Sequence, residues 1–280
     1  TRYGLSAWYL RSKRGLPFLS TDYRDDVTIL NDEPNGVNIN TNCGSTHLGM
    51  LQKGVVEGHY DLGIAFDGDA DRCLAVDELG REVDGDHIMA ICADTLVAQN
   101  KLRGGGFVAT VMSNIGLHKY CEAEGLRLLC APVGDRNVLE LMQKEGMVLG
   151  GEQSGHIIFL DYMPTGDGQL AALQLLSILS HSKKKASELA SAVRQYPQLL
   201  KNVRVSSNDQ KTAIMQSASL QSAIRAAEEE LGENGRVLIR PSGTEPLIRV
   251  MVEAGLLDTA ERVTGFLTQT VENLQKSLGK

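Results

Sequence analysis

Short apolar runs alternate along the chain with longer segments in which apolar residues recur at helical spacing. The short runs have the length and composition of strands, which we expect at 27–30, 62–66, 73–77, 107–112, 127–131, 147–149, 203–205, 237–239 and 247–253. The longer segments predict helices at 47–57, 86–99, 116–124, 137–145, 167–181, 186–194, 217–231 and 259–278. Because strands and helices follow one another in turn, the pattern predicts an α/β protein.

The character of this alternation changes near residues 80 and 198, where we expect domain boundaries. Two predicted helices are preceded by residues suited to a cap. Asp135 precedes the helix at 137–145, and Asp258 with Glu261 has capping-box spacing at the start of the last helix. No internal repeat or low-complexity segment interrupts the pattern.

Three aspartates, Asp67, Asp69 and Asp71, stand at alternate positions directly after the apolar run 62–66. Unit charges 4 Å apart repel by about 4 kcal/mol at an effective dielectric of about 20, so the run indicates either a solvated loop or a bound hard cation. Carboxylates with few other ligands suit magnesium. An EF-hand calcium loop is excluded, because it needs glycine where Arg72 stands and helices where strands are predicted.

A second polar loop lies between the predicted strand 147–149 and the apolar run 157–160. Two glycines there allow close approach of backbone to a ligand. Hydrogen-bonding side chains that suit a polyhydroxylated molecule come from Glu152, Gln153, Ser154 and His156. The alternative is a hairpin loop with polar tips.

A third loop, residues 240–246, joins two predicted strands. An arginine, two hydroxyls and a glycine turn form a phosphate cradle, and an arginine on the following strand adds a second guanidinium. The residues expected to contact phosphate are Arg240, Ser242, Gly243, Thr244 and Arg249. The alternative is a proline-bounded turn with surface arginines.

Composition narrows the class of protein to which the chain can belong. The 280 residues are 42% hydrophobic and 22% charged, as in ordinary globular proteins with room for two or three domains. A net charge of −7 argues against nucleic-acid binding. No apolar run approaches the length of about 18 residues that a membrane span needs, and no secretory signal opens the chain, so we expect a cytoplasmic protein without membrane attachment. Five cysteines without a C-x-x-C pair disfavour disulfides and zinc.

Taken in order, the three loops resemble those of the α-D-phosphohexomutase superfamily, and the resemblance extends from about Val27 to the C-terminus. It implies that Asp67, Asp69 and Asp71 hold Mg²⁺ and that Arg72 lies beside the transferring phosphoryl group. It also implies that the loop 151–156 binds the sugar and the loop 240–246 binds the phosphate that is not reacting. Gln153 and the segment 38–47 are most similar to the phosphoglucosamine mutase branch.

The resemblance further implies the reaction and the domains. The branch interconverts glucosamine 6- and 1-phosphate through a phosphoserine and a sugar 1,6-bisphosphate. Bacterial members of the branch are often dimers, so the resemblance is compatible with a homodimer. The implied fold is α/β: residues 1–80 form a partial metal-binding domain 2 in which 1–24 have no counterpart, 81–197 a sugar-binding α/β domain 3, and 198–280 a small α+β phosphate-binding domain 4.

The sequence also departs from the family pattern. No phosphoserine loop is recognisable, since the nearest string, 179–182, lies in a predicted helix, so we assign no catalytic residue and expect little turnover from this chain alone. Ala70 stands where the family commonly has glycine. The alternatives are a phosphomannomutase/phosphoglucomutase relative, a non-catalytic phosphosugar-binding protein, and a phosphatase of the haloacid-dehalogenase kind with Asp67 as nucleophile.

Overall fold

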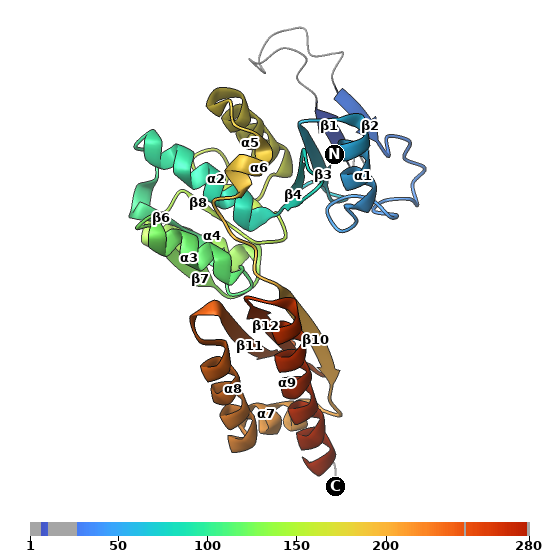
Figure 1. Ribbon diagram of the computed structural model, residues 1–280, viewed down its shortest axis with the longest axis vertical. Coiled ribbons are helices and arrows are strands. Elements are labelled where there is room, and N and C mark those ends of the chain that lie inside the picture. Colours follow the sequence, from blue (N-terminus) through green and yellow to red (C-terminus); the bar gives the residue numbers. More distant parts are fainter. Residues whose placement is uncertain (1–6, 11–26, 244, 279–280) are drawn as a thin grey trace. The chain divides into compact units, whose positions relative to one another are not determined.

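The computed structural model describes residues 7–10, 27–243 and 245–278, and the chain divides into two compact units (Figure 1). The first unit comprises residues 1–113 and 117–194, and the second comprises 114–116 and 195–280. The division at 194 and 195 lies close to the boundary expected near 198, whereas residues on both sides of the boundary expected near 80 belong to one unit.

The first sheet of unit 1 is antiparallel, with the strand order β2-β1-β3-β4-β5. Its elements are β1 (Ala7–Leu10), β2 (Val27–Leu30), α1 (Gly49–Gly58), β3 (Leu62–Phe66), β4 (Cys73–Asp77) and β5 (Glu82–Val83). The strands expected at 62–66 and 73–77 are confirmed to the residue. Strand β1 was not predicted, and the remainder of 1–24 lies outside the described residues.

The second sheet has the order β7-β6-β8-β9, with β6 parallel to β7 and β8 and with β9 antiparallel to β8. Its elements are α2 (Gly85–Ala98), the 3₁₀ turn Arg103–Gly105, β6 (Gly106–Thr110), α3 (Ile115–Ala123), β7 (Arg127–Ala131), α4 (Asp135–Glu145), β8 (Leu149–Gly151), β9 (Ile157–Phe159), α5 (Gly168–Ser182) and α6 (Ala186–Ala190). A large apolar cluster joins residues of both sheets to α2 and α5.

Several expectations for this sheet and its helices were wrong in detail. The strand expected at 107–112 ends at Thr110, and the helix expected at 186–194 ends at Ala190. Strand β8 lies two residues later than predicted, because glycines that suggested a loop are part of the strand. A Cβ on Gly150 would lie 2.6 Å from Met142 Sδ of α4 and 3.0 Å from the Val108 carbonyl oxygen, so glycine suits this closely packed position. Helix α4 begins two residues earlier than expected, with Gly134 rather than Asp135 at its N-cap.

Unit 2 is a three-stranded antiparallel sheet in the order β10-β12-β11, with α8 and α9 running along it (Figure 1). Its elements are β10 (Gln198–Arg204), α7 (Asn208–Gln216), α8 (Ala218–Leu231), the 3₁₀ turn Gly232–Asn234, β11 (Gly235–Pro241), β12 (Leu247–Ala254) and α9 (Leu257–Leu278). Alternate β12 residues, Ile248, Val250 and Val252, enter the core of this unit. Helix α7 was missed, and α9 starts early enough to put Asp258 inside its first turn rather than at a cap.

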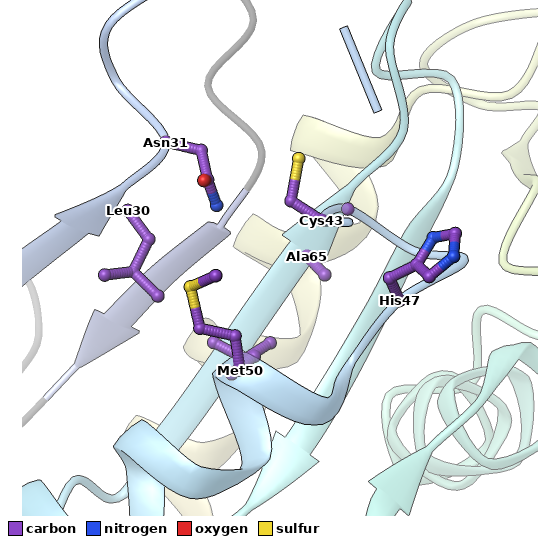
Figure 2. Close-up of a pocket in the computed structure, with 8 residues that line it drawn as sticks. Leu30, Asn31, Cys43, His47, Met50 and Ala65 are labelled. Atoms are coloured by element: carbon purple, nitrogen blue, oxygen red, sulfur yellow. The ribbon is translucent and has the colours of Figure 1, made fainter. Parts of the chain in front are cut away.

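No helix among the described residues is long and apolar enough to cross a membrane. A small pocket in unit 1 lies between the end of β2 and the start of α1 (Figure 2). Its walls are mainly apolar, with Leu30, Met50 and Ala65 among them, and no predicted site residue lines it. A phosphorylated sugar needs convergent polar groups, so this pocket is not the candidate site.

Candidate functional site

The acidic loop is a tight turn between β3 and β4. The Ala70 N–H donates to the Asp67 carbonyl oxygen at 3.1 Å, and the Arg72 N–H donates to Asp67 Oδ1 at 3.2 Å. This fold brings one carboxylate oxygen each of Asp67, Asp69 and Asp71 within 4.8 Å of one another. The sequence predicted such a cluster, and the hairpin supplies it.

Ala70 has a φ of +59°, in the left-handed region that glycine enters freely and alanine enters at a cost. This explains why glycine suits the position. The turn also fixes a neighbouring helix, because the Gly168 N–H at the start of α5 donates to the Ala70 carbonyl oxygen at 3.0 Å.

The electrostatics of the acidic loop favour a cation. Burial and the neighbouring Asp67 carboxylate raise the pKa of Asp71. The Arg72 guanidinium Nε lies 3.6 Å from Asp67 Oδ2 and 4.0 Å from Asp71 Oδ1, so its positive charge lies beside two of the three carboxyl groups. The donor set consists of carboxylate oxygens, the ligand type of magnesium, and the residues therefore fit the metal that the resemblance implies.

The second predicted loop lies directly beside the acidic loop. Arg72 and His156 form an antiparallel backbone bridge, and the Cys73 N–H donates to the Gly155 carbonyl oxygen at 3.0 Å. Gly155 has a φ of +93°, and a Cβ there would lie 2.4 Å from the Cys73 carbonyl oxygen. Only glycine permits this approach. His156 Nε2 then lies 3.6 Å from Asp71 Oδ2, which connects the two loops through side chains as well.

The side chains of the second loop are held by hydrogen bonds from several elements. Ser154 Oγ donates to Glu152 Oε2 at 3.2 Å, and the Gly134 N–H before α4 donates to Glu152 Oε1 at 3.0 Å. The Gln153 side-chain Nε2 donates to Asp84 Oδ2 at 3.2 Å. The four polar residues predicted for this loop thus lie together, and hydrogen bonds to Gly134 and Asp84 hold two of their side chains.

Asp84 and His87, at the start of α2, were missed by the sequence analysis. The Asp84 side chain caps the helix by accepting from the His87 N–H at 3.1 Å, and His87 Nδ1 lies 2.6 Å from the same oxygen. Burial lowers the pKa of His87, but the hydrogen bond and charge of Asp84 outweigh it and raise the pKa overall. An aspartate three residues before a histidine at a helix start was the available signal.

The third predicted loop lies in unit 2, between β11 and β12. Arg240 and Arg249 are cross-strand partners on the two strands, so two guanidinium groups share one end of the hairpin. Burial and the charge of Arg249 lower the pKa of Arg240. The buried Nε atoms of both arginines have no hydrogen-bond partner among the described residues. Two like charges with unused buried donors suit an anion.

A buried lysine in α7, which the sequence analysis also missed, donates hydrogen bonds to the backbone of this loop. Lys211 Nζ in α7 donates to the Ser242 carbonyl oxygen at 2.7 Å and to the Glu245 carbonyl oxygen at 3.3 Å. Ser242 Oγ accepts from the Glu245 N–H at 3.2 Å. Gly243 borders open space, and Thr244 lies outside the described residues.

Two family models match this chain. The alpha/beta/alpha domain III of phosphoglucomutase/phosphomannomutase matches residues 84–196, and the C-terminal domain of the same proteins matches residues 200–268. Together the matches cover well over half of the chain. The chain belongs to the phosphoglucomutase/phosphomannomutase family. The superfamily resemblance of the loops is thereby confirmed, and family membership with the β3–β4 hairpin argues against the haloacid-dehalogenase alternative.

Curated relatives narrow the family. The chain is 51% identical over 255 residues to the phosphoglucosamine mutase of Clostridium tetani, covering 91% of this chain and 57% of that protein. It is 49% identical over 252 residues to the phosphoglucosamine mutase of Rhizobium meliloti, covering 90% of this chain and 55% of that protein. The chain therefore spans a little over half the length of these relatives.

Solved structures agree on the fold. An N-acetylglucosamine-phosphate mutase in its substrate complex matches 83% of this chain and 53% of its own, with a TM-score of 0.66 and 21% identity. The Aspergillus fumigatus N-acetylphosphoglucosamine mutase, in complex with GlcNAc-6P and magnesium, matches 76% of this chain and 48% of its own, with a TM-score of 0.64 and 22% identity. The α/β phosphohexomutase fold expected from the sequence is confirmed.

Proposed function

We propose that this chain carries the metal, sugar and phosphate sites of a phosphoglucosamine mutase, an enzyme that interconverts glucosamine 6-phosphate and glucosamine 1-phosphate. The observation that carries the proposal is the joining of the acidic loop to the sugar loop. The Arg72–His156 bridge and the Cys73–Gly155 hydrogen bond bring three carboxylates beside the polar side chains that the proposal assigns to the sugar. The chain is 51% and 49% identical to two phosphoglucosamine mutases over 91% and 90% of its length, and this identity supports the choice of substrate.

Each loop has a distinct role in this proposal. Asp67, Asp69 and Asp71 hold Mg²⁺, which supplies charge neutralisation for phosphoryl transfer. Arg72 lies against the same carboxylates and can contact the transferring phosphoryl group. Glu152 accepts hydrogen bonds from sugar hydroxyls, Ser154 donates to or accepts from them, and Gln153 and His156 lie in the same loop.

The third loop, in unit 2, is the proposed phosphate site. Arg240 and Arg249, with Ser242, Gly243 and Thr244, bind the phosphate that is not reacting. Holding that distant phosphate lets one site present either end of the sugar, and binding energy far from the reacting atoms is then used for orientation. A phosphoserine and a sugar 1,6-bisphosphate intermediate belong to the same proposal, as do a cytoplasmic location and a homodimer.

An enzyme-coupled assay of the purified chain tests the proposal. With magnesium and glucose 1,6-bisphosphate present, we expect the chain to bind glucosamine 6-phosphate and to convert it very slowly, because no residue of this sequence is assigned as the phosphoserine. Clear turnover that is lost in Asp69→Asn would show that another residue carries the phosphate. Absence of any binding by calorimetry would reject the assignment of all three loops.

A further inference from the structure

The start of α2 holds both the side chain and the backbone of Gln153. Asp84 Oδ2 accepts from Gln153 Nε2 at 3.2 Å, and the Gly85 N–H donates to the Gln153 carbonyl oxygen at 2.9 Å. The other Asp84 oxygen is occupied by His87, which donates from its backbone N–H at 3.1 Å and from its ring Nδ1, 2.6 Å away. Asp84 is 4% exposed and His87 is 6% exposed, so this arrangement is shielded from water.

This contact fixes which way the Gln153 amide points. A carboxylate accepts hydrogen bonds and cannot donate them, so only the NH₂ end of the amide can face Asp84. The carbonyl end, Oε1, is therefore directed away from Asp84. Oε1 has no hydrogen-bond partner among the described residues. Gln153 Oε1 is consequently a hydrogen-bond acceptor in the sugar loop, and the buried Asp84 carboxylate sets its orientation.

We propose that Asp84 is a positioning residue for substrate selection, which orients Gln153 so that Oε1 accepts a hydrogen bond from the amino group of the bound sugar. The inference rests on the proposed function and names what distinguishes its substrate. A protonated amino group only donates hydrogen bonds, whereas a hydroxyl both donates and accepts. An acceptor held in place therefore favours an amino sugar, and an NH₂ group in the same place would disfavour it while still pairing with a hydroxyl.

The geometry provides a sharp way to reverse the amide. In Asp84→Asn, the His87 backbone N–H still requires an acceptor, so the asparagine oxygen takes the position of Oδ1. Its NH₂ group then occupies the position of Oδ2 and faces Gln153. Two NH₂ groups cannot bond to each other, so Gln153 must rotate its amide by half a turn. The NH₂ end of Gln153 would then face the sugar.

Calorimetry with the full chain and magnesium tests this inference, with glucosamine 6-phosphate and glucose 6-phosphate as the two ligands. We expect the wild type to prefer the amino sugar, and Asp84→Asn to lower that preference at least about tenfold, chiefly by weakening glucosamine 6-phosphate. Glu82→Gln is the matched control, because it removes one negative charge from the neighbouring strand β5 and leaves Gln153 bound to Asp84. We expect it to keep the preference.

A double-mutant cycle separates positioning from a structural effect. If Asp84 acts through Gln153, then Gln153→Met lowers the preference by itself, and adding Asp84→Asn to it changes the preference no further. A general loosening of the loop would weaken both ligands alike in either background. If Asp84→Asn does not fold by circular dichroism, Gln153→Met alone still decides, because an unchanged preference in that variant overturns the inference.

The remaining outcomes are also distinct. A wild type that binds both ligands equally overturns the inference and leaves the proposed function intact. A wild type that binds neither ligand overturns both. An equal loss of preference in Asp84→Asn and Glu82→Gln would mean that charge alone selects the amino sugar, and the orientation of Gln153 would then have no role.

Discussion

Replacing Gly85 by alanine tests how tightly α2 is packed against the sugar loop. Gly85 is the first residue of α2, and its φ is not positive, so alanine can adopt its backbone conformation. In an open helix the change would stabilise the protein by up to about 1 kcal/mol. Here, however, the new Cβ would lie 2.0 Å from the Glu152 carbonyl oxygen and 3.0 Å from the Gln153 carbonyl oxygen. Both are backbone atoms and cannot rotate away.

Because of this overlap, Gly85→Ala should destabilise the protein rather than stabilise it. The loop 152–155 must move by more than 1 Å to restore ordinary contact, and overpacking of this kind costs about 1–3 kcal/mol. The shift also endangers the 2.9 Å hydrogen bond from the Gly85 N–H to Gln153, which contributes about 1 kcal/mol. We expect Gly85→Ala to lower the free energy of unfolding by about 1–3 kcal/mol after the gain in helix propensity is subtracted.

Urea unfolding followed by far-UV circular dichroism measures this change. Gly49→Ala is the matched control, because Gly49 is also the first residue of a helix and a Cβ there would meet no atom within 4 Å. We expect the control to be neutral or stabilising. A Gly85→Ala variant as stable as the Gly49→Ala control would refute the packing argument.

Three further predictions follow from charges at the sites. Asp71→Asn should stabilise the metal-free chain, since it removes a repelling charge, and should reduce the rise in melting temperature on adding magnesium; an unchanged rise would contradict the metal assignment. The raised pKa of His87 means that its charged form stabilises the fold below about pH 6.5 and loses this contribution as pH rises through the folded pKa. Wild type and His87→Gln should therefore differ more in melting temperature at pH 6 than at pH 9, and a constant difference would show that the titration of His87 is not linked to folding. Lys211→Met should cost about 1–3 kcal/mol by leaving the Ser242 carbonyl oxygen without its donor, and should weaken phosphate binding in calorimetry; an unchanged phosphate affinity would show that Lys211 does not position the phosphate loop.

Strands β3, β4 and β7 could be predicted from the sequence to the residue, whereas β10 begins five residues before the strand expected at 203–205. The clustering of Asp67, Asp69 and Asp71 could also be predicted. The sequence failed where tertiary packing overrides local preference. Gly150 looks like a loop residue, yet it is part of β8, where a Cβ would lie 2.6 Å from Met142 Sδ of α4. Asp84 and Lys211 were missed because their partners, Gln153 and Ser242, are distant in sequence.

The two loops of unit 1 are supported in the same way, although the residues around them differ. Helix α2 begins against the sugar loop, and α5 begins with Gly168, where a Cβ would lie 2.5 Å from the Arg72 carbonyl oxygen of the acidic loop. Each helix start thus meets loop backbone so closely that only glycine fits. Because α2 and α5 share one apolar core, a displacement of either helix would move both loops. The distance between the carboxylates and the sugar-binding groups is therefore set by helix packing as well as by the loops themselves.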